Sequence, residues 1–203
     1  MNVYFDTIGC RLNQSEIEIM AAQFRKAGHI VVDDAGKADL VVVNTCAVTS
    51  AAASDSRQKI RQAAQKGAGQ MIATGCWATL EPQAALNLPG VENVVLNENK
   101  DHLVSDFLYI TPMVFDLEPL AREPLPGDHL RTRAFLKVQD GCDNFCTFCI
   151  TKVARGKGVS RSLAEVMVDV RNALDGSVKE IVLTGVHLGS WGKDIDQTSH
   201  LRD

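Results

Sequence analysis

Six cysteines are the residues of this 203-residue chain best suited to chemistry, and they fall into two groups of three. One group, Cys142, Cys146 and Cys149, forms the pattern C-x3-C-x2-C within a single short segment. Three thiolates on one loop can ligate three irons of a cubane iron–sulfur cluster and leave the fourth iron open to a substrate or cofactor. The alternative is a zinc loop with a fourth ligand elsewhere, such as His187, although zinc loops usually contain C-x2-C pairs.

The other group, Cys10, Cys46 and Cys76, is spread along the first part of the chain. Its members are 36 and 30 residues apart, and each follows a predicted strand. Because a strand–helix–strand unit takes about 30 residues or more, the three cysteines recur at equivalent positions of successive units. The carboxyl ends of parallel strands share one edge of a sheet, so we expect these cysteines to converge there on an iron–sulfur cluster or zinc. The alternative is that each is a small buried apolar residue.

Short apolar runs alternate with helical patterns over residues 1 to about 110. Strands are predicted at 3–5, 30–32, 40–43, 71–73 and 91–96, and helices at 16–27, 51–66 and 80–86. This alternation predicts an α/β fold with a Rossmann- or flavodoxin-like parallel sheet and helices on both faces. Asn13, with Glu16 three residues later, is interpreted as the N-cap of the first helix and its partner.

A domain boundary is indicated by proline content, because four of the six prolines lie between residues 112 and 130, where no periodicity is present. We therefore predict a linker at 116–130 between a first domain, 1–115, and a second, 131–203.

The second domain begins with one predicted βαβ unit, made of a strand at 134–138, a helix at 162–174 and a strand at 179–185. One such unit cannot bury both faces of its strands. We therefore expect this domain to be truncated, with a further helix starting at Thr198 or Ser199.

Composition places the chain among globular proteins, with 45% apolar residues, 23% charged residues and a net charge of −4. No apolar run approaches the length of a membrane-spanning helix, and the N-terminus lacks the basic start and apolar core of a signal peptide. We therefore expect a cytoplasmic protein with no membrane partner, whose cysteines are not joined in disulfides.

A local basic stretch surrounds the second cysteine group and has a net charge of +5. It could hold RNA phosphates, or it could be an ordinary solvated surface. Its basic residues are Arg131, Arg133, Lys137, Lys152, Arg155, Lys157 and Arg161, and its acidic residues are Asp140 and Asp143.

The C-x3-C-x2-C pattern with Phe148 before its last cysteine resembles the radical S-adenosylmethionine signature. The segments TIGCRLNQSE, NTCAVT and TGC resemble the N-terminal domain of the methylthiotransferases. The segments FLKVQDGCDNFCTFCI, RGKGVSRS and EIVLTGVHLGSWG resemble the start of their radical barrel, a partial TIM-type barrel. Of three groups in that family, which modify threonylcarbamoyladenosine in tRNA, isopentenyladenosine in tRNA or a ribosomal-protein aspartate, the motifs CRLN and TGVHLGS resemble the first most.

This resemblance implies two 4Fe–4S clusters, one on each cysteine group. The cluster on Cys142, Cys146 and Cys149 would bind S-adenosylmethionine and generate a deoxyadenosyl radical, which removes hydrogen from carbon 2 of adenosine 37 in tRNA. The cluster on the first group would supply the sulfur. The implied partners are tRNA and an electron donor protein, and later strands and a small RNA-binding domain would complete the enzyme.

Three further residues are implied to contact the cofactor, while no catalytic side chain beyond the cysteines is identified. Phe148 would stack on the adenine of S-adenosylmethionine, or else pack within its own loop. Gly185 and His187 follow a barrel strand whose end faces the active site, although a structural hydrogen bond is an equal role for His187. Relatives commonly have a proline and an aromatic residue where this chain has Lys152 and Val153, so we expect an altered loop there.

Two other functions are open at this point. One is a zinc-stabilised RNA-binding module without catalysis, and the other is a truncated remnant that is inactive by itself.

Overall fold

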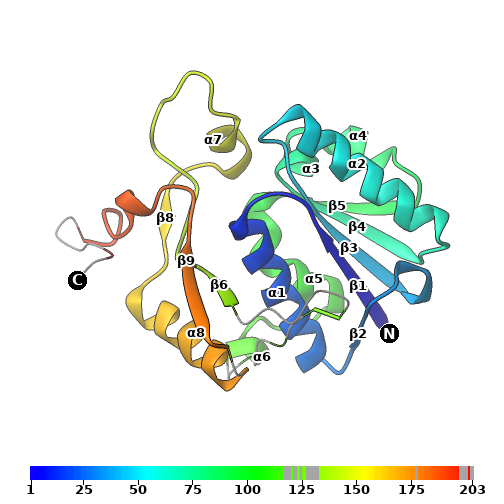
Figure 1. Ribbon diagram of the computed structural model, residues 1–203, viewed down its shortest axis with the longest axis horizontal. Coiled ribbons are helices and arrows are strands. Elements are labelled where there is room, and N and C mark those ends of the chain that lie inside the picture. Colours follow the sequence, from blue (N-terminus) through cyan, green and yellow to red (C-terminus); the bar gives the residue numbers. More distant parts are fainter. Residues whose placement is uncertain are drawn as a thin grey trace.

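The computed structural model describes residues 1–116, 120, 123, 125–126, 133–176, 178–196 and 201. Its first part is a five-stranded parallel sheet in the order β2-β1-β3-β4-β5 (Figure 1). The strands are β1 (Asn2–Thr7), β2 (Ile30–Val32), β3 (Leu40–Thr45), β4 (Gln70–Gly75) and β5 (Val91–Val95). The predicted α/β fold is therefore confirmed. The predicted linker and the predicted helix start at Thr198 or Ser199 lie largely outside the described residues.

Helices cover both faces of this sheet, because side chains along each strand alternate between two apolar cores. On β3, Leu40 and Val42 pack against one layer of helices, while Val41 and Val43 pack against the other. Figure 1 shows α1 and α5 on one side and α2, α3 and α4 on the other. The helices are α1 (Arg11–Lys26), α2 (Ser50–Gln65), α3 (Cys76–Leu80), α4 (Pro82–Leu86), α5 (Leu103–Leu108) and α6 (Met113–Asp116), with short 3-10 turns η1 (Ala35–Lys37) and η2 (Asn97–His102).

The first helix begins five residues earlier than predicted, at Arg11, and Cys10 is its N-cap residue. The interpretation of Asn13 and Glu16 as a capping pair is therefore wrong, because both lie inside the helix and are buried. The predicted helix at 80–86 is divided between α3 and α4 at Glu81, which precedes Pro82 and has a non-helical φ of −129°. The residue before a proline is disfavoured in the helical conformation.

The second part contains β6 (Arg133–Lys137) and β9 (Glu180–Thr184), which pair in parallel and are joined through α8 (Leu163–Asp175). Ser162 and Glu165 form a capping box that starts α8. These elements agree with the predicted βαβ unit. The remaining elements are β7 (Gln139–Asp140), antiparallel to β8 (Val159–Ser160), with α7 (Ile150–Arg155) and η3 (Leu188–Ser190).

Helix α1 packs against the outer edge of β6 and joins the two parts (Figure 1). The hydroxyl of Ser15 accepts a hydrogen bond of 3.0 Å from the backbone N–H of Lys137, so a side chain of one part satisfies an edge-strand donor of the other. The Asn97 amide likewise donates to the Ala154 carbonyl at 2.7 Å. None of the helices in the described ranges has the length and apolar character needed to cross a membrane.

Candidate functional site

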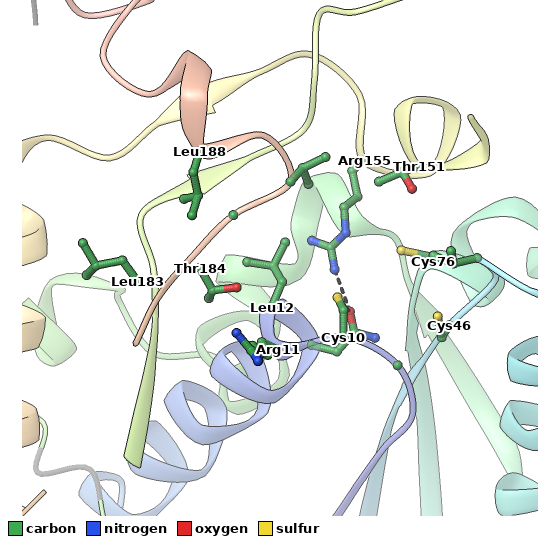
Figure 2. Close-up of a pocket in the computed structure, with 15 residues that line it drawn as sticks. Cys10, Arg11, Leu12, Cys46, Cys76, Thr151, Arg155, Leu183, Thr184 and Leu188 are labelled. Carbon is green, nitrogen blue, oxygen red and sulfur yellow. Dashed lines mark hydrogen bonds between the residues drawn. The ribbon is translucent and has the colours of Figure 1, made fainter. Parts of the chain in front are cut away.

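The cysteines of the first group line one pocket of about 630 Å³ between the two parts of the molecule (Figure 2). Cys10 lies between β1 and α1, Cys46 follows β3, and Cys76 follows β4. The expected convergence at the carboxyl edge of the sheet is thus present. The opposite wall comes from the end of β9 and the residues after it, including Thr184 and Gly185.

Two glycines allow the strand ends to approach this closely. Gly9 and Gly75 have φ values of +119° and +92°, which side-chain-bearing residues rarely adopt. A Cβ atom at Gly9 would lie 2.9 Å from the Cys46 sulfur, and one at Gly75 would lie 2.4 Å from the Thr45 carbonyl oxygen. Any larger residue at either position would therefore push the cysteine-bearing loops apart.

Three cysteine thiols line this pocket, and thiolates are the ligands that soft metals prefer. Burial raises the pKa of the Cys46 thiol; the backbone N–H of Val48 opposes this, and the neighbouring thiols of Cys76 and Cys10 raise the pKa further. Bound iron would remove this mutual repulsion and hold the thiolates. In the described ranges, however, no group of three or more His, Cys, Asp or Glu side chains is arranged to hold a metal ion as it stands. Metal binding by this triad remains a prediction.

The second group lies on the loop between β7 and α7, with Cys142 buried, Cys149 half-buried and Cys146 exposed. The backbone N–H groups of Lys152 and Thr151, in the first turn of α7, lower the pKa of the Cys149 thiol. This favours the thiolate form that ligates metal.

Lys152, one of the two departures from the family pattern, ties α7 to the cysteine loop. Its ammonium lies 3.5 Å from the centroid of the Phe145 ring and donates to the Asp143 carbonyl at 3.1 Å. Phe148 is 90% exposed, so the alternative that it packs within its own loop is wrong.

The two remaining predicted cofactor residues lie in different pockets. Gly185 lines the cysteine pocket, whereas His187 lines a smaller pocket of about 170 Å³ beside Cys142. The backbone N–H of His187 donates to the Gln139 side chain at 2.8 Å, which holds the turn after β9 against β7.

A buried ion network that the sequence analysis missed lies directly beside the cysteine pocket. Glu16 accepts from Arg155 at 2.8 Å, from Lys100 at 2.8 Å and from the Asn44 amide at 3.0 Å. The side chains of Glu16, Arg155 and Lys100 are each only 2% exposed. Arg155 also donates to the Asn13 side chain, and Figure 2 shows its guanidinium pointing toward Cys10. In the sequence, this network was signalled only by the polar residues on an otherwise apolar face of the first helix.

The network continues into the second part and is neutral overall. Arg155 pairs with Asp140 at 2.9 Å, and Lys137 pairs with Asp101 at 2.6 Å. Together with Glu16 and Lys100, the network therefore contains three acidic and three basic side chains. Such complete pairing is what allows ionised groups to be buried.

Four of the seven basic residues in the stretch around the second cysteine group are paired with acids and are therefore not available to RNA phosphates. Lys137 and Arg155 are buried in ion pairs, while Arg133 pairs with Glu180 and Arg161 with Asp169. These charges are neutralised within the molecule because the fold packs acidic residues against them. Arg131 lies outside the described residues.

Replacing Glu16 with Gln should change how stability depends on pH. Burial raises the pKa of Glu16, but Lys100, Arg155 and Lys137 together lower it more, so it lies well below its usual range. Ionised Glu16 therefore stabilises the folded state fully above its unfolded pKa of about 4.3, and this contribution is lost as the pH falls below that value. Urea unfolding from about pH 6 to about pH 3 should show a steeper loss for the wild type than for Glu16→Gln. Parallel curves would contradict this assignment.

The family described as "Uncharacterized protein family UPF0004" matches residues 2–97. "Threonylcarbamoyladenosine tRNA methylthiotransferase MtaB" of Bacillus subtilis is 38% identical to this chain, over 95% of this chain and 45% of the relative. "Ribosomal protein uS12 methylthiotransferase RimO" of Klebsiella pneumoniae is 31% identical, over 94% and 44%. "tRNA-2-methylthio-N(6)-dimethylallyladenosine synthase" of Agrobacterium fabrum is 30% identical, over 93% and 46%. The chain spans about half the length of these relatives.

Proposed function

This chain belongs to the methylthiotransferase family, and we propose that it acts in a tRNA methylthiotransferase that converts N6-threonylcarbamoyladenosine at position 37 of tRNA to its 2-methylthio derivative. The observation that carries this proposal is the shared pocket. Three cysteines from successive strand ends of one sheet face the end of β9, in the unit that also carries the C-x3-C-x2-C loop. This arrangement supports a proposal in which the first cysteine group serves the sulfur donor and the C-x3-C-x2-C loop serves radical generation.

The six cysteines are the proposed ligands of two 4Fe–4S clusters. Their thiols suit such clusters, and the C-x3-C-x2-C loop leaves room for one open iron. When bound, these clusters and S-adenosylmethionine would supply radical generation and sulfur transfer. The chain's own contribution is to gather Cys10, Cys46 and Cys76 at one pocket, whose opposite wall comes from the unit that carries Cys142, Cys146 and Cys149.

Phe148, Gly185 and His187 are the residues we propose to contact S-adenosylmethionine. The exposed ring of Phe148 is free to stack on an adenine, and Gly185 borders the pocket at the end of β9. His187 lies beside Cys142 in the smaller pocket, where it is placed to contact a cofactor bound at that loop.

The choice of substrate within the family rests on relative similarity. Relatives named for threonylcarbamoyladenosine are 31–38% identical to this chain, and those named for uS12 or dimethylallyladenosine are 30–32% identical. Acting on tRNA with an electron donor protein implies a cytoplasmic reaction. The proposed domains are residues 1–115 and 131–203, with further barrel strands and an RNA-binding domain in the whole enzyme.

Mass spectrometry of tRNA nucleosides tests the substrate directly. Cells whose gene for this protein is deleted should lose 2-methylthio-N6-threonylcarbamoyladenosine and accumulate the unmethylthiolated nucleoside, and the gene should restore it. Unchanged levels of that nucleoside, or loss of the methylthio group from dimethylallyladenosine instead, would reject this substrate.

A further inference from the structure

The pocket that holds Cys10, Cys46 and Cys76 contains one charged side chain that no acid neutralises within the described part of the chain. Two arginines line this pocket, Arg11 and Arg155. Arg155 is balanced by Glu16 and Asp140, whereas Arg11 is exposed and forms no ion pair with any described residue. Among the described residues, Arg11 is therefore the one positive charge available to a ligand that enters the pocket.

Arg11 lies on the open side of the second sheet. Its guanidinium carbon is 6.0 Å from the centroid of the Phe135 ring on β6. Ala134 and Leu136, the neighbours of Phe135, pack in the core beneath α8, so strand alternation places Phe135 on the opposite face. Figure 2 shows the Arg11 side chain extending from the start of α1 toward Thr184.

The rest of the pocket wall is largely apolar and suits a flat purine ring. Its apolar side chains come from both parts of the molecule. They are Leu12, Val48, Leu183, Val186 and Leu188. An apolar wall with one charge at its edge is selective for a ligand that combines an aromatic ring with an anionic group.

We infer that Arg11 binds the carboxylate of the threonylcarbamoyl group and so selects this substrate, an inference that rests on the proposed function. A guanidinium can bind a carboxylate through two parallel hydrogen bonds. In adenine, carbon 2 and the carbon that bears the substituted nitrogen flank the same ring nitrogen. The receptor for the substituent must therefore lie near the sulfur-donor site, and Arg11 is adjacent in sequence to Cys10.

The same charge disfavours the dimethylallyl substrate. A dimethylallyl group has no polar atoms, so it would displace water from Arg11 without providing a new partner. Arg11 would thus discriminate between the two substrates in two ways. It forms an ion pair with the threonylcarbamoyl carboxylate, and it disfavours the apolar dimethylallyl group. Because Arg11 is exposed, we expect the effect on binding to be about ten- to hundredfold.

Direct binding of three RNA probes to the whole enzyme, in which this chain is joined to the remaining barrel strands and the RNA-binding domain, tests this role. All are the same anticodon stem–loop; one carries threonylcarbamoyladenosine, one its methyl ester and one dimethylallyladenosine. The wild type should prefer the free carboxylate about tenfold or more, Arg11→Gln should lose this preference, and Arg11→Lys should retain part of it. Arg171→Gln, at an exposed arginine on α8, is the matched control and should behave as the wild type.

Each of the other outcomes contradicts the inference, and each one points to a different explanation. Stem–loop binding without discrimination by the wild type, or unchanged discrimination by Arg11→Gln, rejects the role of Arg11 and leaves the proposed function intact. If Arg11→Gln instead weakens only the binding of S-adenosylmethionine, the carboxylate that Arg11 binds is the one on that cofactor. Arg11-dependent binding of a uS12 peptide that contains the target aspartate would assign the site to protein substrates. Failure to bind any of the three RNAs would count against the proposed function itself.

Discussion

Replacing Arg155 with Met is expected to lower the free energy of unfolding by about 3–5 kcal/mol, the usual cost of removing one partner from a buried ion pair. The substitution keeps most of the side-chain volume but removes the charge. Glu16, which is 2% exposed, would keep its ion pair with Lys100 but lose the one with Arg155, and Asp140 would lose its contact of 2.9 Å. Urea unfolding followed by circular dichroism at neutral pH measures the change.

The matched control for this prediction is Arg171→Met, which removes an exposed arginine from α8. Its effect should stay within about 0.5 kcal/mol, as for most surface substitutions. A double variant with Glu16→Gln should be less destabilised than the sum of the two single variants, because both remove the same interaction. If Arg155→Met cost less than about 1 kcal/mol, the network would not hold the two parts together.

Removing one cysteine from either group should abolish one cluster and leave the other. After anaerobic reconstitution, the proposal predicts about eight iron atoms per chain, and about four in either Cys46→Ala or Cys146→Ala. Each variant is the control for the other, because the two cysteines belong to separate groups in separate parts of the fold. Iron and sulfide analysis, with zinc measured in parallel, gives the result.

The outcome of that measurement also separates the competing functions. Zinc without sulfide would indicate the zinc-stabilised module. Loss of all iron in both variants would show that the six cysteines share one centre, contrary to two separate sites. Since Cys46 is buried, circular dichroism of each variant must show that the fold is retained.

The ion network gives α1 a second role, which is to connect the two parts of the chain. The polar residues Asn13, Ser15 and Glu16 are buried and bond to groups of the second part of the chain or to its neighbours. Helix α1 begins next to Cys10, and α7 ends at Arg155 after the C-x3-C-x2-C loop. The pairing of Glu16 with Arg155 therefore joins the helix that follows Cys10 to the helix that follows the second cysteine group.

Local sequence determined most of the first sheet. The run Leu40 to Val43 is apolar at every position, as expected of a strand buried on both faces, and the strand at 30–32 was predicted with the bounds that the structure has. The spacing of Cys10, Cys46 and Cys76 was sufficient to predict their convergence, because equivalent ends of parallel strands must meet at one edge.

Tertiary structure alone decided which charges are available to ligands. Arg11 and Arg155 are the same residue type near the same cysteines, yet one is exposed and the other is enclosed by Glu16 and Asp140. Helix periodicity and residue type reflect local geometry, whereas ion pairing depends on contacts between residues more than one hundred positions apart, such as Glu16 and Arg155. The sequence by itself therefore determined the sheet and the cysteine groups, and the packing of α1 against the second part determined how the pocket is charged.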